Sequence, residues 1–151
     1  MKKKEVRLYN VLFPVWILLT LPQMWLYVIP GNFIIDSLVL IMAMKVLKVE
    51  NRKDFYKKHI LGVIGFGFLS DILAALPMWA GVFLEWGGPY ADSLVLTLPG
   101  VVLAGVLIFL FNYFVTFRKC EKPLRKRLAL TFAIATAPYT FLIPSSWLYG
   151  F

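Results

Sequence analysis

The sequence contains few of the residues from which metal sites and catalytic centres are usually built. Among 151 residues there is one cysteine, Cys120, and one histidine, His59, with eight acidic residues against sixteen basic ones. A single cysteine excludes an intramolecular disulfide, and a lone histidine without a nearby Cys or Glu cluster does not supply the ligands of a zinc site. The sequence therefore predicts no metal site and no cofactor.

Charged residues of either sign are also scarce. They make up 16% of the chain, whereas 60% of the residues are hydrophobic. Soluble domains are about one quarter charged and about half apolar, so a soluble core could not absorb this much apolar surface. We therefore expect an all-α, polytopic integral membrane protein in a plasma (inner) membrane.

The basic residues are confined to three clusters, at residues 2–7, 45–58 and 118–127, with none between Lys58 and Arg118. A net charge of +8 would suggest a nucleic-acid partner in a soluble protein. Clusters that alternate with long apolar segments instead follow the positive-inside pattern of membrane proteins. We expect no nucleic-acid partner, a cytoplasmic N-terminus and a C-terminus on the outer side.

Five apolar segments predict a five-span transmembrane helical bundle that forms one domain over residues 1–151. The predicted spans are residues 8–29, 33–47, 60–84, 94–117 and 128–149. Pro30-Gly31-Asn32 has turn chemistry and is predicted to separate the first two spans, although a single long kinked helix competes with this interpretation. Residues 85–92, which contain Gly-Gly-Pro, are predicted to form the outer turn between the third and fourth spans.

The second and third basic clusters suit the anionic inner leaflet of a membrane, because each nearby base contributes about 1 kcal/mol of attraction. The predicted lipid-contacting residues are Lys48, Arg52, Lys53, Lys57, Lys58, Arg118, Lys119, Arg125 and Arg127. Each of the last four spans also carries a stripe of small or polar residues, which favours close helix packing. The same stripes could pack against a second copy of the chain or against another membrane protein, so a homo-oligomer or a membrane-protein partner is possible.

Asp71 is the only charged residue in the segment 60–84. A charge near the middle of a bilayer costs between about 3 and more than 10 kcal/mol, so this carboxyl must be protonated, paired or hydrated. Two interpretations stay open: a protonatable or cation-binding transport site, or a protonated Asp that hydrogen-bonds across helices for structural reasons. The candidate intramembrane polar residues are Asp71, Asp36, Asn32, Ser70 and Asn112.

The two intramembrane acids are predicted to lie at different depths. The helical rise places Asp71 ~16 Å from the inner boundary and Asp36 ~5 Å below the outer one, where it could be hydrated or cap a helix. The carboxyl groups would then be roughly 10 Å or more apart, which is too far for a shared-proton pair.

Three functions remain under consideration. The first is a non-enzymatic membrane component or subunit, in which Asp71 is dispensable. The second is a small-solute, ion or proton-coupled transporter that uses Asp71. The third and most distant is an intramembrane aspartyl enzyme that uses Asp36 and Asp71 together, which requires the two carboxyls to lie close to each other.

Overall fold

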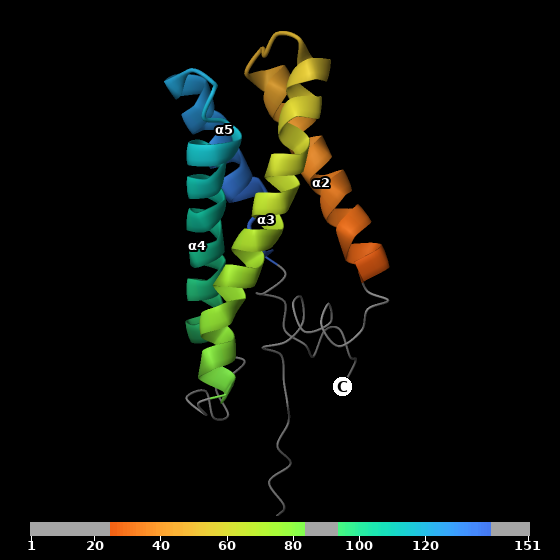
Figure 1. The fold of residues 1–151 in the computed structure, drawn as a ribbon. Helices are drawn as coiled ribbons and strands as arrows, with labels where there is room; N and C mark the ends of the chain where they lie inside the picture. The colour runs from red at the N-terminus through yellow and green to blue at the C-terminus, as the bar shows by residue number, and fades with distance from the viewer. Residues whose placement is uncertain (1–24, 84–93, 140–151) are drawn as a thin grey trace, which may run out of the picture.

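The computed structural model describes residues 25–83 and 94–139. These residues contain helices and no strand, which confirms the all-α prediction. The helices are α2 (Trp25–Val46), α3 (Arg52–Phe83), α4 (Leu94–Phe111), the π-helix η3 (Asn112–Thr116) and α5 (Lys122–Ala135) (Figure 1). The predicted outer turn at residues 85–92 and most of the predicted first span lie outside the described residues.

The helices pack side by side, with α3 in contact with both α2 and α4. Helix α5 packs against α4 and also reaches α2, which closes the bundle behind α3 (Figure 1). The α2–α3 turn and the turn that follows η3 lie at the same end of the bundle (Figure 1). We call this end the basic end, because the second and third basic clusters of the sequence form it.

The turn between α2 and α3 is tight and uses two residues with positive φ angles, Lys48 (φ 53°) and Asn51 (φ 48°). Asn tolerates this left-handed conformation better than most residues. Backbone N–H groups of Leu47 and Val49 donate to the carbonyls of Ala43 and Met44, at 2.9 and 3.0 Å, and so satisfy the end of α2. Helix α3 therefore starts at Arg52, eight residues before the start of the predicted third span.

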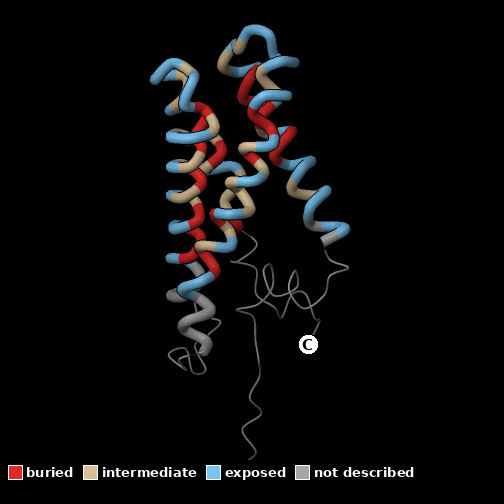
Figure 2. The backbone as a smooth tube through the Cα atoms, in the orientation of Figure 1, coloured by how far each residue is buried: buried red, intermediate tan, exposed pale blue. Residues whose placement is uncertain are grey.

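The buried core lies on the inner faces of all the helices (Figure 2). It is formed by the apolar residues Leu40, Ala43, Met44, Ile60, Val63, Ile108, Phe117, Leu128 and Phe132. Outside this core, large apolar side chains such as Leu26, Val46 and Leu61 are about three-quarters exposed. A soluble protein rarely leaves so many large apolar side chains uncovered, whereas a bilayer would cover them.

Three of the described segments are long and apolar enough to cross a membrane: Ile29–Val46, Arg52–Pro77 and Leu98–Thr116. They correspond to the second, third and fourth predicted spans. The fifth predicted span, residues 128–149, differs from the structure in its bounds, because α5 begins earlier, at Lys122, and ends at Ala135. Residues 140–151 of that span lie outside the described part.

The predicted turn at Pro30-Gly31-Asn32 is wrong, because these residues lie inside α2. Proline removes one backbone donor, but apolar helices of membrane proteins tolerate it when neighbouring groups satisfy the freed carbonyl. Gly31 has open space beside its backbone and forms no close approach there. Helix α2 consequently begins at Trp25, and Asp36 lies at its middle, about 16 Å from that start by helical rise.

Candidate functional site

The two intramembrane acids lie on the sides of α2 and α3 that face each other. Asp36 is buried, and its Oδ2 atom lies 3.8 Å from the position that a Cβ atom on Gly67 would occupy. Gly67 and Asp71 are four residues apart on α3 and so share one helix face. Because Gly67 has no side chain, the Asp36 carboxyl can lie directly against α3, one helical turn from Asp71.

The predicted difference in depth between these acids is therefore wrong. It depended on a turn at Pro30, which would have placed Asp36 near the outer boundary. With α2 continuous from Trp25, Asp36 lies near mid-helix and faces α3. The Asp36 carboxyl thus contacts α3 at Gly67, one helical turn from Asp71.

The Asp71 carboxyl is not used as a structural hydrogen-bonding group by the part of the chain that the structure describes. Its Oδ1 atom is buried and has no hydrogen-bond partner among those residues. The neighbouring Ser70 is fully buried, but its hydroxyl donates to the Phe66 carbonyl at 2.7 Å and so does not pair with Asp71. Ser70, predicted as a site residue, is satisfied within its own helix.

A hydroxyl pair that the sequence analysis missed joins α2 to α3 beside Asp36. Ser37 is buried, and its Oγ atom lies 2.7 Å from Oη of Tyr56. Tyr56 stands in the second turn of α3, near the basic end. Its position was not predicted because residues 48–59 fall between the second and third predicted spans, whereas a helix from Arg52 places Tyr56 in register with Gly67 and Asp71.

Asn112 lies at the start of η3 and is fully buried. Its Nδ2 atom donates to the Ile108 carbonyl at 2.9 Å, and its Oδ1 atom has no partner among the described residues. The contacts of η3 with α3 fall on another face of α3, because Thr116 packs on Gly62. Gly62 is about 140° around the helix from Gly67, so the structure does not bring Asn112 to the acid pair.

Asn32 is half-buried and lies one turn before Asp36 on α2. Among the predicted polar residues, the structure thus brings together Asp36 and Asp71 and adds Ser37 and Tyr56 beside them. The described residues contain no group of three or more His, Cys, Asp and Glu side chains that could hold a metal ion.

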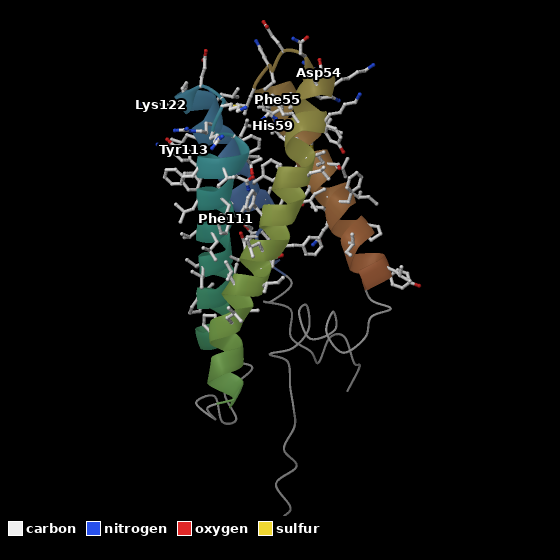
Figure 3. All side chains as sticks on the ribbon, viewed as in Figure 1. Asp54, Phe55, His59, Phe111, Tyr113 and Lys122 are labelled. Atoms are coloured by element: carbon white, nitrogen blue, oxygen red, sulfur yellow. The ribbon has the colours of Figure 1, made fainter. Side chains whose placement is uncertain are left out.

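The predicted lipid-contacting residues gather at the basic end. Eight of the nine are exposed: Lys48, Arg52, Lys53, Lys57, Lys58, Arg118, Lys119 and Arg127. Arg125 is half-buried, with its guanidinium carbon 4.1 Å from the centre of the Tyr113 ring. Figure 3 shows Asp54 and Lys122, from the first turns of α3 and α5, at this same end.

His59 is buried within an aromatic cluster and does not face the membrane interface. Its ring lies 4.2 Å from that of Phe55 and 5.3 Å from that of Phe117, measured between centroids (Figure 3). Its Nδ1 atom lies 2.8 Å from the carbonyl oxygen of Phe55. A carbonyl oxygen only accepts hydrogen bonds, so Nδ1 carries the hydrogen and donates it. The residue packs α3 onto Phe117, just after η3, and takes no part in the acid pair.

We expect the Cys120 thiol to react slowly at neutral pH. Burial raises the pKa of this thiol above its ordinary value, against the opposing effects of Lys58 and Arg125. Because the thiolate is the nucleophile, a raised pKa lowers its fraction at any given pH below that value. The rate of maleimide labelling should therefore lie below that of a free cysteine peptide and continue to increase beyond the pH at which the peptide levels off. Lys58→Ala should slow labelling further, and a plateau at lower pH than the peptide's would contradict the effect of burial.

Comparison of the chain with protein-family models, with curated proteins and with solved structures finds no match. No relative therefore supplies a function. The function has to be derived from the acid pair and its surroundings.

Proposed function

We propose that this chain is a non-enzymatic, multi-pass membrane component that binds and releases a proton or an alkali cation at Asp36 and Asp71. Such binding would be one step in the transport of an ion or a small solute. The observation that carries the proposal is that the buried Asp36 carboxyl of α2 lies against Gly67 of α3, one helical turn from Asp71. Intramembrane acids generally mark ion or proton pathways.

The sequence offers these carboxylates no basic partner at their depth. No Lys or Arg occurs between Arg7 and Lys45 or between Lys58 and Arg118. Two carboxylates near each other in a medium of low dielectric constant repel strongly, and a proton or a cation removes that repulsion. A bound positive charge is thus the simplest way to offset the repulsion between the Asp36 and Asp71 carboxylates.

A purely structural acid would be expected to hydrogen-bond a neighbouring helix. The buried Oδ1 atom of Asp71 has no such partner among the described residues, and Ser70 is bonded to its own helix instead. This favours ion binding over a role in assembly alone.

We further propose that the basic end faces the cytoplasm and that the protein crosses a plasma membrane five times. Exposed Lys and Arg side chains at one end of an apolar bundle fit the positive-inside pattern. The same side chains would contact the anionic lipids of the inner leaflet.

The proposal is tested by charge displacement in proteoliposomes adsorbed to a solid-supported membrane. Binding of an ion at a site within the membrane gives a transient current even when no transported solute is known. We expect a rapid jump in pH, Na⁺ or K⁺ to produce a transient that protein-free liposomes lack. The absence of a transient with all three ions would overturn the proposal.

A further inference from the structure

A row of polar side chains leads from the basic end to the acid pair. Tyr56 is half-buried near the basic end, and its hydroxyl is within hydrogen-bonding distance of Ser37, at 2.7 Å. Ser37 is adjacent to Asp36 in α2, and both residues are buried against α3. The hydroxyl pair thus ends beside a carboxyl group that lies one helical turn from Asp71.

The face of α3 that is turned toward α2 is continuous. Tyr56, Ile60, Val63, Gly67 and Asp71 follow one another at spacings of three or four residues. Contacts at both ends of this row show that it faces α2: Tyr56 meets Ser37, and Gly67 meets Asp36. Tyr56 and Asp71 are about 22 Å apart along the helix. Between them, Asp36 of α2 contacts α3 at Gly67.

We infer that the ion exchanged at the acid pair is a proton and that it travels between the basic end and Asp36 through the hydroxyl groups of Tyr56 and Ser37. This inference rests on the proposed function, because it assumes that the acid pair binds a positive ion. A proton from water at the basic end bonds to Tyr56 Oη, which releases its own proton to Ser37 Oγ. Ser37 releases its proton to the Asp36 carboxylate, directly or through one bridging water. The net change is one proton gained by the carboxylate, and both hydroxyls are restored.

A chain of hydroxyl groups passes protons but not alkali cations. Between Tyr56 and Gly67 the α3 face presents Ile60 and Val63, which are buried. A cation entering there would have to shed its hydration shell against apolar side chains without enough oxygen atoms to replace it. A proton moves by exchanging O–H bonds and needs no such opening.

The described charged groups around the route leave Asp36 and Asp71 as its acceptors. Helix α4 has no titratable side chain. The basic side chains of α5 lie in its first turns, at the basic end. His59 lies on another side of α3, with its ring packed at a tilt against those of Phe55 and Phe117. Tyr56, whose hydroxyl lies 2.7 Å from that of Ser37, is the further titratable side chain on this face of α3.

The experiment measures the time course of the charge displacement that follows a pH jump. Tyr56→Phe and Ser37→Ala each remove one hydroxyl, and we expect each to slow the displacement by about tenfold or more while the total displaced charge stays unchanged. Ser37→Thr keeps a hydroxyl and should restore the rate. Tyr113→Phe and Ser70→Ala are the matched controls, because their hydroxyls lie outside the route, and they should keep the wild-type rate.

The outcomes separate this inference from the proposed function. A wild-type rate in both Tyr56→Phe and Ser37→Ala, together with a strongly reduced transient in Asp71→Asn, would overturn the hydroxyl route and leave the acid pair as the ion site. A transient current that depends on the Na⁺ or K⁺ concentration but not on pH would also overturn the hydroxyl route and leave the acid pair as the ion site. Total displaced charge that equals wild type in Tyr56→Phe, Ser37→Ala and Ser37→Thr shows that these three variants fold.

Discussion

Asp71→Asn is expected to reduce the pH-driven charge displacement in proteoliposomes to well below the wild-type value, because Asp36 is then the only acid of the pair that can bind a proton. Asparagine has nearly the same shape as aspartate but can neither carry the negative charge nor accept a proton at any accessible pH. The Oδ1 atom of Asp71 has no hydrogen-bond partner among the described residues, so the substitution breaks no structural bond that they show. The loss should therefore be functional, with the helix content and the monodispersity of the protein unchanged.

Asp54→Asn is the matched control for this variant. Asp54 lies on the same helix, in its first turn, and is exposed at the basic end (Figure 3). We expect it to retain the full displacement, and Asp71→Glu, which keeps a carboxyl group, to retain part of it. Full displacement in Asp71→Asn would remove Asp71 from the ion site.

Phe117→Ala is expected to lower the free energy of unfolding by about 3–5 kcal/mol, the usual cost of removing a buried aromatic side chain. Phe117 is fully buried, and its ring lies 6.1 Å from Phe132 and 6.2 Å from Phe55, measured between centroids. It thus joins the segment after η3 to α3 and α5. Unfolding in detergent micelles, followed by circular dichroism against denaturant, measures the loss.

Phe114→Ala provides the comparison for the same substitution at an exposed position. Phe114 lies in η3, and 62% of its surface is exposed in the bundle. Its replacement removes little packing between helices, so we expect a change within about 1 kcal/mol. Equal losses for the two variants would show that Phe117 does not join the helices as described.

The sequence was sufficient to predict helical structure, the apolar segments and the gathering of basic residues at one end. These features depend on composition and on long runs of similar residues, which tertiary contacts do not change. Asp71 could be selected for the same reason, because a single acid in a long apolar segment is visible without a structure. Asp36 could also be selected as a candidate, but it was placed at the wrong depth, because its depth depends on the course of α2.

Two of the errors concern the bounds of α2 and α3. Pro30-Gly31-Asn32 has turn chemistry, but the apolar residues on both sides of it continue one helix. The segment 48–58 is charged enough to be interpreted as a loop, yet α3 already begins at Arg52. The second error hid Tyr56, because a residue in a loop has no helix face to share with Asp71.

The measurement that tests the central claim most directly is the titration of the carboxyl groups in bilayers, followed by the infrared absorption of protonated carboxyls. It compares wild type with Asp36→Asn and Asp71→Asn. If the two acids form one site, protonation of one changes protonation of the other, and the wild-type curve will differ from the sum of the curves that Asp36 and Asp71 give alone. A wild-type curve equal to that sum would contradict the pairing of Asp36 with Asp71.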